Sequence, residues 1–136
     1  METLDKRHKA IVSTLETLQK ALIDIKNPAH QVVYTNMRDS VIQRFEFSID
    51  TLWKFLKIYL QEKRNISIQD ASPRAILRQS LVANLINEQE FKVLIKCVED
   101  RNLTSHTYNE GLAEEILGRI PDYYRVMKNL INKMEI

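Results

Sequence analysis

The segment QRFEFSIDTLWKFLKIYL, residues 43–60, predicts a helix that is apolar on two opposite faces. At about 100° per residue, one broad face collects large apolar side chains. Its members are Phe45, Ile49, Leu52, Trp53, Leu56 and Leu60. Phe47, Phe55 and Ile58 lie roughly opposite. The broad face predicts a helix in the core of a bundle.

The second apolar face suggests contact with another chain. One helix cannot bury two opposite faces inside a thin bundle that has one side in water. The simplest partner is a second copy, so Phe47, Phe55 and Ile58 are candidates for a homodimer interface. The alternative is that residues 64–71, or the short helix after them, cover Phe47 and Phe55.

A charged stripe separates these two faces. It consists of Glu46, Asp50, Lys54, Lys57 and Gln61. Acidic and basic members fall three or four residues apart, which is the spacing of ion pairs along a helix surface. We interpret the stripe as a solvated edge and not as a catalytic carboxylate pair.

Helical patterns continue toward the N-terminus. Apolar residues at alternating steps of three and four predict a first helix of about 23 residues, which ends before Asn27-Pro28. The second helical pattern runs from about His30 to Lys63, and residues 65–70 have the polar composition of a connection.

Three more helices are predicted toward the C-terminus. Ser72-Pro73 opens a short one that extends through Leu85, and Asn87 with Glu90 forms a capping box for the next. The last begins near residues 109–111; its apolar phase survives Pro121, so we expect a kink there, with a full break as the weaker option. The sum is an all-α, antiparallel up-and-down four-helix bundle with one additional short helix.

Composition limits the classes of function. The 136 residues carry a formal charge of only +2, which argues against nucleic-acid binding by bulk electrostatics, although Arg74, Arg78, Arg119 and Arg125 would extend a basic rim if the fold brings them together. Two glycines exclude glycine-rich phosphate loops. The three histidines are far apart and no cysteine pair accompanies them, so we expect no metal site and no cofactor; His106 with Glu110 is the weak exception.

The cysteine content and the lack of long apolar runs suggest where in the cell the protein works. Cys97 is the only cysteine, which rules out an internal disulfide, and its neighbours Leu94 and Val98 indicate a small buried side chain. No apolar run approaches the ~20 residues that cross a bilayer, and the first residues lack the apolar centre of a signal peptide. We therefore expect a cytoplasmic protein.

The stretch EDRNLTSHTYNE, residues 99–110, is the candidate site. Phe91, Leu94, Ile95 and Val98 share one helix face, and Arg101, Asn102, Ser105 and His106 continue that same face. Tyr108 falls beside Arg101 at i+7. Polar groups where a core would continue must bond to one another, line a cleft or meet a partner. The alternative is an ordinary helix end, at which Arg101 and His106 cap carbonyl groups.

These residues resemble the signature of the HEPN superfamily. Arg101, four residues, His106, one residue and Tyr108 form its motif, with the polar Asn102 directly after the arginine. The segments DSVIQRFEFSIDTLWKFLKIYL, ASPRAILRQSL and EDRNLTSHTYNE, in this order, are similar to the branch called nucleotidyltransferase substrate-binding proteins. The resemblance covers about residues 4–134 and implies one HEPN-like helical domain over residues 1–136.

The resemblance implies a homodimer that acts with a separate minimal nucleotidyltransferase chain. Several such proteins are toxins with metal-independent endoribonuclease activity, and the nucleotidyltransferase is the antitoxin, which can silence the toxin by transferring AMP to the tyrosine. By this resemblance Arg101 binds phosphate, His106 is the acid/base residue and Tyr108 is the modifiable residue. Asn102 would orient His106, with Ser105 in support.

Three functions stay open at this point. The first is a toxin-type endoribonuclease regulated by AMP transfer, and the second is a non-catalytic subunit that binds a nucleotide or other substrate for the nucleotidyltransferase. The third is a purely structural helical dimer with a capped helix end.

Overall fold

The computed structural model describes residues 3–106, 109–134 and 136 of the chain, and all its regular elements are helical. They are α1 (Leu4–Ile25), the 3-10 segment η1 (Pro28–Val33), α2 (Tyr34–Lys63), α3 (Pro73–Val82), α4 (Glu88–His106) and α5 (Glu110–Lys133). The predicted all-α class, with four long helices and one short helix, is confirmed.

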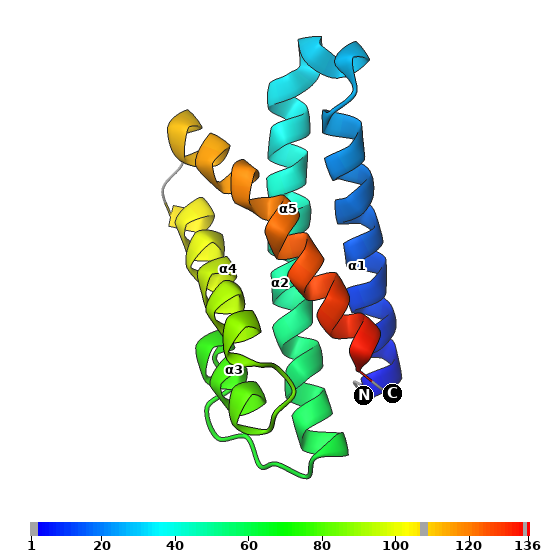
Figure 1. The fold of residues 1–136 in the computed structure, drawn as a ribbon, viewed down its shortest axis with the longest axis vertical. Helices are drawn as coiled ribbons and strands as arrows, with labels where there is room; N and C mark the ends of the chain where they lie inside the picture. The colour runs from blue at the N-terminus through cyan, green and yellow to red at the C-terminus, as the bar shows by residue number, and fades with distance from the viewer. Residues whose placement is uncertain (1–2, 107–108, 135) are drawn as a thin grey trace.

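The helices form a bundle around α2 (Figure 1). Helices α1 and α2 lie side by side, while α5 runs obliquely across them and also contacts α4. The short α3 packs against α2 and α4. Helix α2 therefore has neighbours along most of its length, and α4, which carries Arg101, is one of them.

The broad apolar face of α2 forms the centre of the core, as the sequence predicts. Phe45, Ile49, Leu52, Leu56 and Leu60 are fully buried. Trp53 is the exception, because it stays half-buried at the edge of this face.

The expectation that the opposite face of α2 is uncovered is wrong at Phe55. Its side chain is 0% exposed, and its ring lies 5.8 Å from the ring of His8 on α1 and 5.9 Å from that of Tyr59. Helix α1 packs along α2 and covers this position. Ile58 is partly buried against the core, whereas Phe47 is 46% exposed.

Two helix boundaries differ from the prediction. Helix α2 begins at Tyr34 and not near His30, because Asn27 accepts a hydrogen bond from the Ala29 N–H at 3.0 Å and starts the 3-10 segment instead. Helix α3 ends at Val82 and not at Leu85.

Asn84 explains the early end of α3. It has a positive φ of 59°, the left-handed conformation that asparagine tolerates at a helix C-terminus. The Leu85 N–H then donates to the Ser80 carbonyl at 2.9 Å, and the Asn84 N–H donates to that of Leu81 at 3.1 Å. This pair of bonds is a Schellman motif.

The predicted caps at Ser72 and Asn87 and the predicted start of the last helix near residues 109–111 are confirmed. Ser72 accepts a hydrogen bond from the Ala75 N–H, and Asn87 and Glu90 cap each other reciprocally at 2.8 and 2.9 Å. Asn109 caps α5 through the Leu112 N–H at 2.7 Å. Helix α5 continues through Pro121, so the option of a full break is wrong.

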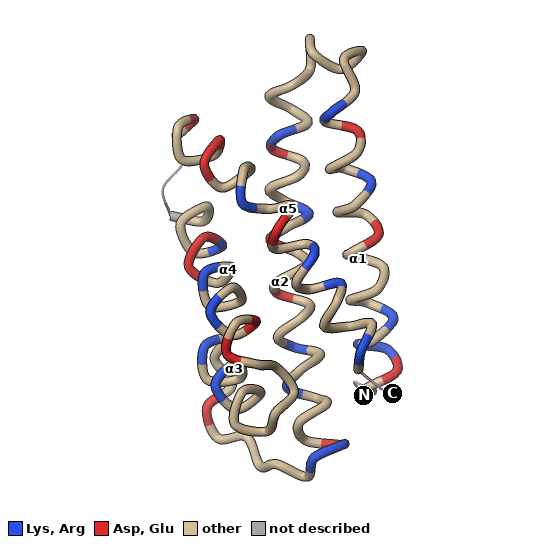
Figure 2. The backbone as a smooth tube through the Cα atoms, viewed as in Figure 1, with Lys and Arg blue, Asp and Glu red and all other residues tan. Residues whose placement is uncertain are grey.

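Charge is spread over the whole molecule. Figure 2 shows Lys and Arg interspersed with Asp and Glu along the helices, as the near-balanced composition predicts. Within the described residues, none of the helices has both the length and the apolar character needed to span a membrane.

Candidate functional site

Arg101 of α4 points toward α2 and binds two carboxylates there. Its Nη2 lies 3.1 Å from Asp50 Oδ2, and its Nε lies 3.3 Å from both Asp50 oxygens. Its Nη1 donates to Glu46 Oε2 at 3.0 Å. Asp50 and Glu46 are one helical turn apart, so the planar guanidinium bridges successive turns of α2.

Two neighbours on α4 complete this cluster. Thr104 Oγ1 donates to Glu46 Oε2 at 2.5 Å, and Arg101 Nη1 donates to Ser105 Oγ. The hydrogen bond to Asp50 is the main cause that raises the pKa of Arg101 above its ordinary value. Arg101 is therefore a fixed and permanently charged group.

The cluster corrects the interpretation of α2's charged stripe at two positions. Glu46 and Asp50 are both partly buried against α4 and bind Arg101, so they are not part of a solvated edge. Two carboxylates and one guanidinium sum to a formal charge of −1. An incoming phosphate therefore meets an arginine whose charge is already compensated.

A cleft of about 400 Å³ opens beside Arg101, and we call it the Trp53 cleft. It is lined by Ile49, Asp50, Trp53, Lys54, Pro73, Val98, Arg101, Asn102 and Ser105. Three predicted site residues, Arg101, Asn102 and Ser105, thus meet in one concave surface. Asn102 and Ser105 are exposed within it.

A second cleft, of about 510 Å³, lies on the Glu46 side of the same cluster between α2 and α5. Thr104 and Glu46 line it on the side of the cluster, and Ile42, Ala113 and Ile116 are among its apolar residues. Asp39 and Glu46 give it an acidic lining. We call it the α2–α5 cleft.

The remaining motif residues are only partly described. Helix α4 ends at His106, so the backbone of the predicted acid/base residue continues the helix that carries Arg101. The His106 side chain and all of Tyr108 lie outside the described residues.

The sequence did not predict the ion pair between Arg119 on α5 and the buried Asp100 on α4, which lies next to the site. Asp100 is fully buried, although on a helical wheel it lies opposite the apolar face of Phe91 and Leu94. It accepts hydrogen bonds from Arg119 Nε at 2.8 Å and from the Tyr123 hydroxyl at 2.6 Å. Arg119 and Tyr123 are four residues apart on the α5 face that also buries Ile120. A polar pair on an otherwise apolar face was the signal that could have revealed them.

This pairing also removes Arg119 from the expected basic rim. The guanidinium of Arg74 lies 3.7 Å from Glu99, and that of Arg125 binds Asp122. The rim is thus compensated by carboxylates at three of its four positions.

A buried arginine joins the starts of α2 and α5. Arg38 is nearly inaccessible, and its Nη1 donates to Glu114 Oε1 at 3.2 Å while its Nε donates to Asp39 Oδ1 at 3.3 Å. The Tyr34 hydroxyl also donates to Glu114, at 2.9 Å. These bonds hold the far end of the α2–α5 cleft.

The described part of the chain holds no preformed metal centre, since no group of three His, Cys, Asp or Glu side chains within it is arranged to hold a metal ion.

Solved structures with this fold include one from Thermus thermophilus, which is 35% identical, covers 85% of this chain and 97% of its own, and gives a TM-score of 0.67. A tri-AMPylated Shewanella oneidensis HEPN toxin in complex with the MNT antitoxin is 19% identical, with 97% and 96% coverage and a TM-score of 0.75. A toxin–antitoxin structure with AMP-PNP is 17% identical, with 97% and 98% coverage and a TM-score of 0.73.

The two low-identity structures show that the chain has the fold of HEPN toxins. A search of curated proteins gave no match. The family model described as nucleotidyltransferase substrate binding protein like matches residues 6–136, which is nearly the whole chain. With its HEPN-type bundle and this match over nearly its whole length, the chain belongs to the nucleotidyltransferase substrate-binding-protein-like family.

Proposed function

We propose that this chain is the HEPN-type partner of a separate minimal nucleotidyltransferase and acts as a metal-independent endoribonuclease of a toxin–antitoxin pair. The family match and the shared fold with HEPN toxins bound to MNT antitoxins support this assignment. The protein would work as a homodimer in the cytoplasm, with RNA as its substrate.

One observation carries the proposal. Arg101, Asn102 and Ser105 line a single cleft of about 400 Å³, and the helix that bears them continues to His106. Arg101, Asn102 and the His106 backbone thus belong to one helix, beside a space whose volume would suit a small ligand.

The chemistry fits these residue types. Cleavage of RNA through its own 2′-hydroxyl needs a group that takes and returns a proton near neutral pH, and the ordinary pKa of a histidine is ~6.5. His106 would serve this role. The planar, permanently charged guanidinium of Arg101 would stabilise the extra negative charge of the pentacoordinate phosphorane.

Regulation would act at Tyr108. Attack of its hydroxyl on the α-phosphate of ATP at the nucleotidyltransferase, with release of pyrophosphate, would place a bulky phosphodiester anion close to Arg101. The added group would occupy the cleft and compete with RNA for the guanidinium.

The test is RNA cleavage by the purified protein in EDTA. Wild-type protein is expected to leave 2′,3′-cyclic phosphate ends, and His106→Ala is expected to abolish cleavage while the fold and the oligomeric state persist. His30→Ala, which changes a histidine in η1 at the far end of α1, is the matched control and should cut normally. Equal activity in both variants would overturn the ribonuclease assignment.

A second candidate function is supported by the compensation of Arg101. Glu46 and Asp50 already bind the Arg101 guanidinium. Their negative charge weakens the electrostatic stabilisation that Arg101 would give to a highly charged transition state, but Arg101 would still be able to bind the phosphate of a nucleotide. The chain would then be a non-catalytic subunit that presents a nucleotide or other substrate to the nucleotidyltransferase. Calorimetry that shows nucleotide binding, together with intact RNA in the assay above, would select this function.

A further inference from the structure

We infer that Trp53 is the stacking platform for a nucleobase in the Trp53 cleft, with the phosphate of the same nucleotide at Arg101. The inference rests on the proposed function only in that the cleft receives RNA or a nucleotide. It adds a residue outside the arginine–histidine–tyrosine motif, on a different helix.

The burial pattern of α2 singles out Trp53. Phe45, Leu52 and Leu56 on the same broad face are inaccessible to solvent, because neighbouring helices cover them. Trp53 stays half-buried against the core and also lines the cleft. An aromatic side chain held in the core on one side and open to a cleft on the other is a rigid surface for stacking.

The spacing between Trp53 and the arginine fits one nucleotide. Trp53 follows Asp50 by three residues on α2, which is about 4.5 Å along the helix axis. Asp50 in turn binds the Arg101 guanidinium at 3.1 Å. A base on the indole and a phosphate at the guanidinium would thus lie in adjacent parts of the same cleft.

The walls of the cleft match a base and its sugar. Ile49, Pro73 and Val98 supply apolar surface for the ring. The Asn102 amide and the Ser105 hydroxyl supply donors and acceptors for a base edge or a ribose hydroxyl. The volume of about 400 Å³ lies within the ordinary range of small-ligand sites.

Charge distinguishes this cleft from the larger one. The Nζ of Lys54 lies 5.8 Å from the centre of the Trp53 ring, so the Trp53 cleft has a second cation, which offsets the formal charge of −1 on the cluster of Arg101, Asp50 and Glu46. The α2–α5 cleft is lined by Asp39 and Glu46, and its lining residues among those described include no lysine or arginine. A phosphate is therefore better accommodated in the Trp53 cleft than in the α2–α5 cleft.

Trp53 is the only tryptophan of the chain, so its fluorescence reports on this cleft alone. Wild-type protein is titrated with AMP, with ribose 5-phosphate and with a short oligoadenylate in EDTA at 4 °C. AMP and the oligonucleotide are expected to quench the fluorescence, whereas ribose 5-phosphate, which lacks a base, should leave it nearly unchanged. Tighter binding of the oligonucleotide than of AMP would identify RNA as the source of the base, and the reverse order would identify a free nucleotide.

Three variants test the stacking directly, with AMP affinity measured by calorimetry. Trp53→Leu is expected to weaken AMP binding by about tenfold, because stacking on an aromatic ring contributes most of the energy per base. Trp53→Phe keeps a ring and should lose threefold or less. Tyr124→Leu, an aromatic change on α5 outside the lining of the cleft, should bind AMP like wild type.

The inference is overturned if Trp53→Leu binds AMP as tightly as wild type, or if AMP leaves the fluorescence unchanged at saturation. Either result, combined with normal RNA cleavage by Trp53→Leu, would leave the proposed ribonuclease intact. Trp53-dependent AMP binding by a protein that cuts no RNA would support the inference and remove the ribonuclease. Thermal unfolding followed by circular dichroism confirms that each variant is folded before its affinity is interpreted.

Discussion

The guanidinium of Arg119 on α5 grips the fully buried carboxylate of Asp100 on α4, with Nε 2.8 Å from Oδ2 and Nη2 3.0 Å from Oδ1. The Tyr123 hydroxyl donates to the same carboxylate at 2.6 Å. These hydrogen bonds satisfy the oxygens of the buried carboxylate in place of water. Asp100 directly precedes Arg101, so these bonds from Arg119 and Tyr123 hold α4 against α5 next to the candidate site.

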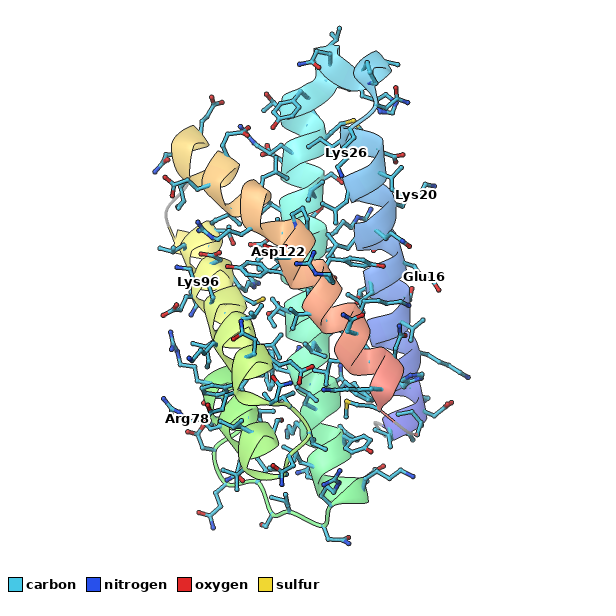
Figure 3. All side chains as sticks on the ribbon, viewed as in Figure 1. Glu16, Lys20, Lys26, Arg78, Lys96 and Asp122 are labelled. Atoms are coloured by element: carbon cyan, nitrogen blue, oxygen red, sulfur yellow. The ribbon has the colours of Figure 1, made fainter. Side chains whose placement is uncertain are left out.

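Loss of Arg119 should therefore destabilise the fold. Among the described residues, Arg119 is the only cation that binds the buried Asp100 carboxylate, so Arg119→Ala leaves the Tyr123 hydroxyl as its donor. We expect this variant to lose about 2–3 kcal/mol in the free energy of unfolding, measured with urea. Arg125→Ala on the same helix is the control, because its pair with Asp122, labelled in Figure 3, is 65% and 68% exposed. That variant should lose about 1 kcal/mol or less. Equal losses would show that burial of Asp100 does not matter.

Cys97 predicts a change of stability at alkaline pH. Burial is the main cause that raises the pKa of its thiol well above the ordinary value, and the nearby Asp100 adds to it. In the unfolded chain the thiol ionises near pH ~8.5, whereas in the folded chain it stays protonated. The folded state then binds more protons above that pH, so this stability is fully present below pH ~8.5 and is lost as pH rises toward the folded pKa.

The measurement compares urea unfolding at pH 7.5 and pH 9.5. Wild-type protein should lose up to about 1.4 kcal/mol per pH unit above the unfolded pKa through this group. Cys97→Ala should be less stable at both values because of the cavity, but with a shallower decline between them. Parallel declines in the two proteins would contradict the assignment to Cys97.

Asp50 should oppose the binding of phosphate. Asp50→Asn removes one negative charge beside Arg101 while Glu46 still orients the guanidinium, so we expect AMP to bind several-fold more tightly, about 1 kcal/mol. Trp53 fluorescence or calorimetry measures the change. Glu16→Gln, at an exposed position of α1 labelled in Figure 3, alters the net charge equally and should have little effect. Weaker AMP binding in Asp50→Asn would mean that Asp50 helps binding by orienting the Arg101 guanidinium more than it opposes binding by compensating the guanidinium charge.

Phe47 is the described residue of α2 on which the dimer prediction now depends. It is 46% exposed, and a charged side chain there should disfavour an apolar contact between two copies. Phe47→Glu is expected to shift the protein from dimer to monomer in sedimentation experiments. Val82→Glu, at an apolar position of α3 that is 78% exposed, is the control and should remain a dimer. A dimer that survives Phe47→Glu would place the interface elsewhere.

Local patterns were sufficient for the architecture. The three-four periodicity and the caps at Ser72, Asn87 and Asn109 act within a few residues, so the helices and most of their starts followed from the sequence. The end of α3 did not, because the left-handed conformation of Asn84 is one of several that asparagine adopts.

Contacts between helices were beyond the same reasoning. Glu46 and Asp50 looked solvated on the wheel of α2, yet Arg101 reaches them from 55 and 51 residues away. Asp100 lies off the apolar face of α4 and is buried because α5 approaches from that side. Phe55 is covered by α1 for a similar reason. A wheel shows which residues share a face but not how many neighbours surround the helix.

Glu90 joins the beginning of α4 to the end of α5. Its carboxylate caps the Asn87 N–H and also accepts from Lys133 Nζ at 2.7 and 2.8 Å. Asp100 of α4 also binds Arg119 and Tyr123 of α5, so the two helices are joined at two positions along their length. We therefore expect α4 and α5 to unfold locally as one cooperative unit. Native-state hydrogen exchange would then show matching protection for the central amides of both helices.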